Sequence, residues 1–140
     1  MINLAAARDR LAELITAQVG DRAIDPEAPA VWRGALDAVP AMPLIAIGVP
    51  EWEPDVQPCM DLTTIPVGVV VEMPGGNAGA VQDQLESLWS EVVAGLREDL
   101  TAQPGLGVAK VVVIKRARFG PFIIQGTEYP AMVTFLEFYG

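Results

Sequence analysis

Apolar residues recur at helical spacing in two stretches of the chain. The first stretch covers residues 2–19, and its apolar set is Leu4, Leu11, Leu14, Ile15 and Val19. The second covers residues 78–102, and its set is Val81, Leu85, Leu88, Trp89, Val92, Val93, Leu96 and Leu100. Because residues three, four and seven positions apart share one side of a helix, each set predicts an amphipathic helix.

Both predicted helices are bounded by residues that favour helix ends. Gly20 follows the first helix, and glycine readily adopts the backbone conformation that ends one. Asn77 is a candidate N-cap for the second helix, and Pro104 and Gly105 follow its last turn. We therefore expect helices over residues 2–19 and 78–102.

Five other segments are rich in β-branched and aromatic residues, which favour strands. They cover residues 44–49, 65–73, 108–119, 122–125 and 130–139, with turn-forming residues at 74–77. Connections of hairpin length at residues 120–121 and 126–129 favour antiparallel pairing. This order predicts an α+β fold, a mainly antiparallel sheet of four to five strands with two helices packed on one face.

The segment at about residues 21–64 departs from this pattern. It contains seven prolines, Trp32, Trp52 and many acidic residues around the apolar run at 44–49. We interpret it as an irregular, acidic, proline-rich excursion from a single domain. That domain spans residues 1–140, a length that suffices for one hydrophobic core.

Several predicted strands carry apolar residues on both faces. They include residues 44–47, 67–71, 111–114 and 132–138. Since successive side chains of a strand point to opposite faces, a sheet covered on one side should alternate apolar and polar residues. We therefore expect a wide apolar second face that needs a cover. The proline-rich excursion is one candidate cover, and a neighbouring subunit is the favoured one.

Charge is unevenly distributed along the chain. Four of the nine basic residues lie within nine positions, at Lys110, Lys115, Arg116 and Arg118. The acidic run Glu51, Glu53, Asp55 and Asp61 contains no basic residue. If identical subunits meet head to tail, a basic edge of one can face an acidic segment of the next, which fixes their orientation. Two separate solvated patches are the alternative.

These observations define the residues that we expect at a subunit interface. The basic side comprises Lys115, Arg116, Arg118, Phe119 and Phe122. The acidic side comprises Glu51, Trp52, Glu53 and Asp55. A net charge of -9 repels phosphate backbones, so we do not expect this chain to grip DNA or RNA.

The sequence offers little of the chemistry that enzymes use. It contains no histidine, the most common acid–base residue near neutral pH, and a single Cys59 that has no cysteine partner in the chain. Ser87 and Ser90 lie within the second predicted helix, without a neighbouring base. Residues 75–79 match a turn and helix start better than a phosphate-binding loop. We therefore predict no catalytic residue, metal or cofactor, and we do not expect an enzyme.

No membrane segment is expected either. The longest uncharged stretch, residues 38–50, contains three prolines and is shorter than the roughly 20 residues that span a bilayer. Arg8, Asp9 and Arg10 interrupt any apolar region of a signal peptide near residue 1. We expect the chain to remain in the cytoplasm of the cell that makes it.

Taken in order, the predicted elements resemble the tail terminator proteins of long-tailed bacteriophages. The resemblance covers most of the chain. It is carried by the helix at residues 2–19 with Arg8-Asp9-Arg10-Leu11, and by Ile65-Pro66-Val67, Val81-Gln82-Asp83-Gln84-Leu85 and Glu128-Tyr129-Pro130-Ala131-Met132-Val133-Thr134. The proline-rich segment at residues 24–64 is longer than this family leads us to expect between its first helix and its sheet.

The resemblance implies a structural virion protein at the head–tail junction, assembled in the host cytoplasm. Such a protein forms a homohexameric ring that contacts the tail tube protein on one side and a head-completion or neck protein on the other. DNA would pass through the ring without specific binding, which the acidic charge favours. Two alternatives are a head-closure or neck connector of the same particle and a small-molecule-binding enzyme with a pocket under the excursion.

Overall fold

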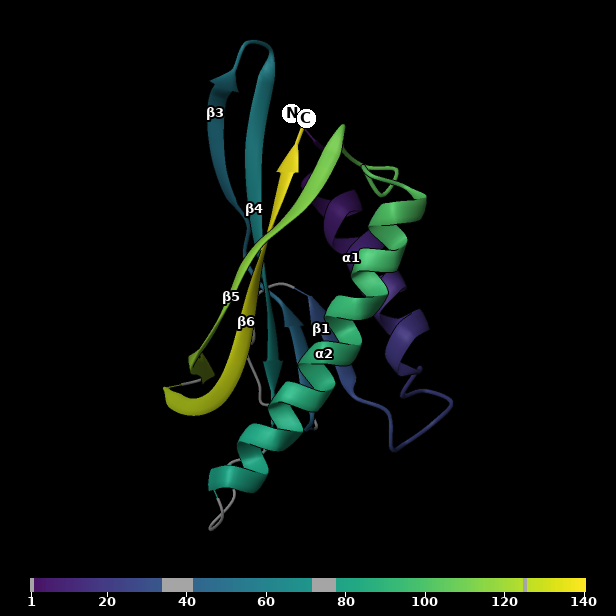
Figure 1. The fold of residues 1–140 in the computed structure, drawn as a ribbon, viewed down its shortest axis with the longest axis vertical. Coiled ribbons are helices and arrows are strands. Elements are labelled where there is room, and N and C mark those ends of the chain that lie inside the picture. The colour runs from purple at the N-terminus through teal and green to yellow at the C-terminus, as the bar shows by residue number, and fades with distance from the viewer. Residues whose placement is uncertain (1, 34–41, 72–77, 125) are drawn as a thin grey trace.

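The protein forms two layers in a computed structural model that describes residues 2–33, 42–71, 78–124 and 126–140 (Figure 1). One layer is a six-stranded sheet, and the other contains α1 (Leu4–Val19) and α2 (Ala78–Ala102). Both helices lie on the same face of the sheet. The predicted α+β class and mainly antiparallel sheet are confirmed, but the sheet has six strands rather than four to five.

The strands are β1 (Ala30–Arg33), β2 (Leu44–Ile47), β3 (Glu51–Gln57), β4 (Met60–Val70), β5 (Val111–Ile124) and β6 (Thr127–Tyr139). Their order across the sheet is β1-β2-β4-β6-β5, and β3 also pairs with β4. β1 and β2 are parallel, whereas every other described pair is antiparallel. β3 and β2 pair with successive parts of β4, so one half of the sheet has the order β3-β4-β6-β5.

The expectation of an irregular excursion at residues 21–64 is wrong for much of that segment. Besides β2, which was predicted as a strand at residues 44–49, it contains β1, β3 and the start of β4, which begins at Met60 rather than at residue 65. Pro54 lies within β3, and the register of β3 shifts between Glu53 and Gln57. Edge strands tolerate proline and bulges, because one side of their backbone needs no partner strand. Residues 34–41 lie outside the described part.

β5 also differs from its prediction. The sequence predicts two segments joined at residues 120–121, whereas Gly120 and Pro121 lie inside one strand, paired with Ala131 and Pro130. This position at the edge of the sheet explains how the strand accommodates proline. The chain reverses at Gly126, whose φ of 77° suits glycine, so β6 starts at Thr127 rather than at residue 130.

α1 begins and ends as its sequence favours. The Asn3 side chain accepts a hydrogen bond from the Ala6 backbone N–H at 3.0 Å, which caps the first turn. Gly20 follows the last residue with a φ of 99°, and its N–H bonds the Thr16 carbonyl. The helix therefore starts two residues later than predicted and stops at the predicted residue.

α2 covers the predicted residues 78–102. Leu85, Val92 and Leu96 are its most buried large side chains, and they face the core. Gly95 allows α1 to approach closely, because a Cβ there would lie 2.5 Å from the side-chain oxygen of Gln18. The predicted cap Asn77 and the turn at residues 74–77 lie outside the described residues. Over the described part of the chain, no helix has both the length and the apolar character needed to cross a membrane.

The main hydrophobic core fills the space between the helices and the sheet. Its buried members come from both helices and from the helix-facing sides of β2, β4, β5 and β6. They include Leu11, Ile15, Ile45, Ile47, Ile65, Leu85, Leu96, Leu136 and Phe138. Trp89 at the edge of this core donates an indole hydrogen bond to the Thr134 hydroxyl at 2.8 Å.

A second cluster packs on the opposite face of the sheet, which is called the open face below. It consists of Leu44, Ala46, Val70, Ile124, Ala131 and Val133, packed against Ala30, Met42, Phe122, Tyr129 and Phe135. The expectation of a wide exposed apolar patch is therefore wrong for this half of the sheet. The long β5–β6 hairpin supplies much of the cover, since the Phe122 ring lies 3.1 Å from where a Cβ on Gly68 would stand.

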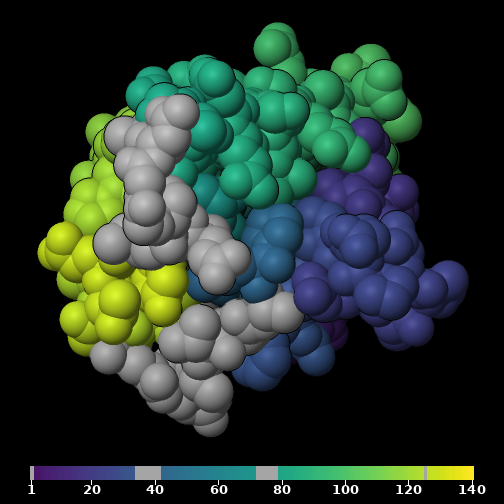
Figure 2. All heavy atoms as spheres, turned by 90° about the horizontal axis from the view of Figure 1, so that it is seen from below, coloured from purple at the N-terminus to yellow at the C-terminus, as the bar shows by residue number. Residues whose placement is uncertain are grey.

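The end of the β5–β6 hairpin forms one corner of the molecule. Viewed from below, it lies beside the start of α2, and the segment around residues 20–30 lies at the far side (Figure 2). Phe119 and Ile123 in this hairpin are 56% and 63% exposed. The end of the β3–β4 hairpin points the other way along the sheet (Figure 1). The molecule therefore has two distinct ends.

Candidate subunit interface

The register of the strands determines which charged side chains share the open face. Glu51 of β3 pairs with Thr64, Thr64 pairs with Glu137, and Glu137 pairs with Val113 of β5. Paired residues have side chains on the same face of a sheet. This row therefore crosses the open face from the acidic strand β3 to the basic strand β5.

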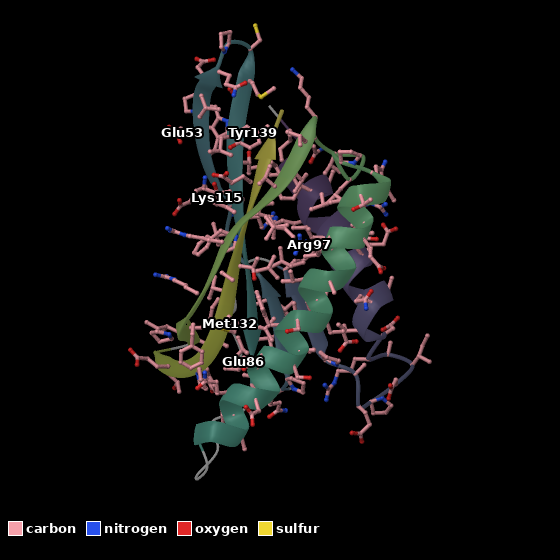
Figure 3. The ribbon with its side chains drawn as sticks, viewed as in Figure 1. Glu53, Glu86, Arg97, Lys115, Met132 and Tyr139 are labelled. Carbon is pink, nitrogen blue, oxygen red and sulfur yellow. The ribbon has the colours of Figure 1, made fainter. Side chains whose placement is uncertain are left out.

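A bulge at Lys115 turns the basic residues of β5 toward the open face. Ile114 pairs with Leu136, and the next paired residue, Arg116, faces Phe135, so Lys115 is the extra residue. If Lys115 instead paired regularly with Phe135, Arg116 would lie on the same side as Ile114, toward the helices. Arg118 follows Arg116 by two positions and shares its face. Lys115 points away from both helices (Figure 3).

The two arginines cover an aromatic ring that the helices do not reach. The Arg116 and Arg118 guanidinium carbons lie 5.2 Å and 5.7 Å from the centre of the Phe135 ring. At exposed sites each such cation–π contact contributes about 0.5–1 kcal/mol. These contacts hold the positive charges in place on the open face.

Opposite charges line a hollow on this face, called the charged hollow below. Its volume is about 330 Å³, and its lining residues are Glu51, Thr64, Lys115, Arg116, Phe135 and Glu137. It presents one guanidinium and one ammonium group beside two carboxylates, which suits recognition of a charged protein surface. Within the described residues, no three His, Cys, Asp or Glu side chains lie close enough to hold a metal ion.

The hydroxyl group of Tyr139 supports one of these carboxylates. It donates a hydrogen bond to Glu137 Oε1 at 3.1 Å. This bond and then partial burial raise the pKa of Tyr139 above its ordinary value, because the protonated hydroxyl is the form that donates. Tyr139 therefore helps to orient Glu137 at the margin of the charged hollow.

The acidic and basic strands lie at opposite edges of the same half of the sheet. In the order β3-β4-β6-β5, Glu51, Glu53 and Asp55 belong to the first strand, and β5 carries only basic charges. No described strand pairs with the outer side of either β3 or β5. The sequence placed these charges on different elements, and the structure puts them at two edges.

Trp52 alternates with Glu51 and Glu53, so it lies on the helix-side face of β3. It is 50% exposed, and its indole Nε1 donates to Asp61 Oδ2 at 3.3 Å. The Asp55 backbone N–H donates to the other Asp61 oxygen at 3.1 Å. The bond from Asp55, followed by the weaker effect of Trp52, lowers the pKa of Asp61, because both donors favour the charged carboxylate.

The nine predicted interface residues thus fall into separate groups. Lys115, Arg116 and Glu51 meet at the charged hollow. Phe119 is exposed on the other face of the hairpin, near Ile123. Phe122 lies on the open face, but it is half-buried over Gly68 in the second cluster. The predicted set is therefore not one continuous patch.

A groove between α2 and the edge of β5 has no counterpart in the sequence analysis. Its volume is about 560 Å³, and its lining residues are Val93, Arg97, Leu100, Thr101, Val112, Val113 and Ile114. Arg97 lies between α2 and the sheet (Figure 3). Val93 and Leu100 belong to the apolar stripe of α2, so the sequence showed them only as core candidates. Phe135 and Glu137 were missed in the same way, because they share a face only through the pairing of β6.

Comparison with known proteins does not identify a family for this chain. The sequence matches no protein-family model, and no curated protein matches it. The function proposed for the chain therefore rests on its own residues and geometry, together with the resemblance in element order.

Proposed function

We propose that this chain is a structural subunit of a long-tailed bacteriophage and that it forms a homohexameric ring at the head-proximal end of the tail tube. The ring ends tube polymerisation and joins the tail to the head. One observation gives the main support: acidic β3 and basic β5 form opposite edges of one half of a sheet. This arrangement suits a head-to-tail contact between identical copies.

Charge on two different edges favours a ring over a two-fold dimer. In a two-fold dimer the same patch meets itself, which would bring Lys115, Arg116 and Arg118 against their own copies. In a head-to-tail contact, β5 of one copy meets β3 of the next, and opposite charges approach. Such contacts close into a ring when the rotation between copies divides a full turn.

The two ends of the molecule suit two different partners. If the strands run along the ring axis, the β3–β4 hairpin lies at one end and the β5–β6 hairpin with exposed Phe119 and Ile123 lies at the other. We propose that one end contacts the tail tube protein and the other a head-completion or neck protein. The acidic charge of the chain, -9 overall, favours passage of DNA without specific binding.

Removing the gene from the phage that carries it tests this role. We expect tails that are longer than normal and that are not joined to heads, as seen by electron microscopy of the lysate. Tails of normal length that fail to join heads would instead support a head-closure or neck role. Normal, infectious particles made without the chain would contradict both roles.

A further inference from the structure

The groove between α2 and β5 lies beside an edge with no described strand on its outer side. Val93, Leu100 and Val112 give its lining an apolar part, and Arg97 and Thr101 add polar groups. Val113, next to Val112, is 40% exposed. An extended segment that paired with β5 would bring its helix-side residues over this groove.

The chain itself contains a strand with a fitting side chain. Trp52 is half-exposed on the helix-side face of β3, and β3 has no described strand on its outer side. An indole is flat and largely apolar with one N–H donor, so it suits this mixed lining, and a guanidinium such as that of Arg97 stacks well on it.

The register places Trp52 and the groove at the same level of the sheet. Trp52 pairs with Thr63, Thr63 with Phe138, and Phe138 with Val112. A closed ring has no net shift along its axis from one copy to the next. When the axis follows the strands, Trp52 of the next copy therefore arrives beside Val112.

The direction of the strands and the charges of the other face agree with this contact. β3 runs parallel to β6 and antiparallel to β5, so adding the next copy's β3 to β5 continues an antiparallel sheet with all helices on one side. On the open face the same pairing brings Glu51 to the level of Val113, next to the bulge at Lys115.

We propose that β3 of one copy pairs with β5 of the next and that its Trp52 fills the groove between α2 and β5. This inference rests on the proposed ring and names the contact that holds the ring together. Trp52 supplies the apolar anchor on the helix side, and on the open face Glu51 approaches the cations that begin at Lys115.

A disulfide trap tests the register directly. Glu51→Cys and Val113→Cys are combined in a Cys59→Ser chain, and the purified protein is oxidised alone and with tail tubes. Within one copy these positions are three strands apart, roughly 14 Å, so they cannot join. Directly opposite residues of antiparallel strands have Cα atoms about 4.5–5.5 Å apart, which suits a disulfide. We expect covalent multimers on a non-reducing gel, and none from the control pair Glu51→Cys with Ile123→Cys.

Two tryptophan variants test the anchor. We expect Trp52→Ala to weaken self-association about tenfold or more, measured by sedimentation over a concentration series, because a buried interface tryptophan is typically a dominant contact. Trp32→Ala is the matched control, since Trp32 is 40% exposed on β1, away from the proposed contact, and should change association less than about twofold. Val93→Arg, which fills the groove, should match Trp52→Ala while leaving the circular dichroism spectrum unchanged.

The outcomes separate this inference from the proposed function. Absence of specific cross-links with and without tubes, or normal assembly of both Trp52→Ala and Val93→Arg, overturns the Trp52 contact. If these variants assemble normally but the chain is found as a ring on tails, only the contact is wrong. If the contact forms but the chain is absent from particles, the contact stands and the phage role is wrong.

Discussion

The two halves of the open face differ in what covers them. Beside β2, apolar residues such as Leu44 and Val70 are buried under the chain's own hairpin and form a second core. Beside β3, the face carries Arg116, Arg118 and two glutamates around Phe135. Apolar residues on both faces of a strand therefore do not by themselves indicate a partner, because a long curved hairpin can cover one of the faces.

The largest expected effect comes from the half that covers itself. Leu44 is fully buried in the second cluster, so Leu44→Ala should lower the free energy of unfolding by about 2–5 kcal/mol, as in any well-packed core. Urea denaturation measures this change. Leu85→Ala in the main core is the reference and should have a similar effect. A change below about 1 kcal/mol for Leu44→Ala alone would mean that this half is not a true core.

An intermediate effect is expected for the residue that provides the cover. Phe122 is half-buried over Gly68, so Phe122→Ala should cost about 2 kcal/mol, less than the 3–5 kcal/mol typical of a fully buried phenylalanine. The exposed Phe119 is the matched control on the same strand, and Phe119→Ala should change unfolding by under about 0.5 kcal/mol. Equal effects of the two variants would contradict the cover.

A smaller change in stability is expected in the charged half. Arg116→Glu with Arg118→Glu removes both contacts to the Phe135 ring and should cost about 1–2 kcal/mol of unfolding free energy. The same variant should weaken self-association, since Glu51 of the next copy would then approach two added carboxylates. Arg22→Glu with Arg33→Glu reverses two charges elsewhere and should leave association intact. Normal association of the first variant would show that the charges of β5 play no part in assembly.

The smallest effect is expected for Asp61, whose carboxylate accepts hydrogen bonds from Trp52 and Asp55 of β3. The pKa of Asp61 lies below its ordinary value of 3.8, so its ionised form stabilises the fold above pH 3.8, and this contribution is lost as the pH falls through the folded pKa. Asp61→Asn should therefore be slightly less stable than wild type at neutral pH, and the difference should shrink below about pH 4. Thermal melts at several pH values measure it. A difference that stays constant down to pH 2 would show that ionisation of Asp61 is irrelevant.

The sequence predicted those elements whose signal is local and strong. α2 was predicted residue for residue, because its apolar stripe repeats along the whole helix and is set by neighbours in the chain. Even there, the apolar stripe did not predict which of its residues are the most buried, since Leu88 is half-buried and Leu85 is fully buried. β1 and β3 were missed because these short edge strands show no regular apolar alternation, and because the seven prolines of residues 21–64 indicated an irregular segment.

The candidate interface was predicted in its charges but not in its geometry. Lys115, Arg116 and Arg118 stand out in sequence as a basic cluster beside no acidic residue. Their common face depends on a bulge and on pairing with Phe135 and Glu137, about 20 positions away in the chain. Pairing between distant strands is set by tertiary packing, so no local pattern could have indicated the charged hollow or the groove.

The extra residue at position 115 determines which face the rest of β5 presents. If the strand paired regularly, with Lys115 opposite Phe135, every residue from Arg116 to Ile124 would change face, and both guanidinium groups would turn toward α2. Deleting Lys115 would instead keep Arg116 opposite Phe135, because it removes only the residue that has no partner in β6. Such a deletion is therefore expected to straighten the strand locally while leaving its arginines on the open face.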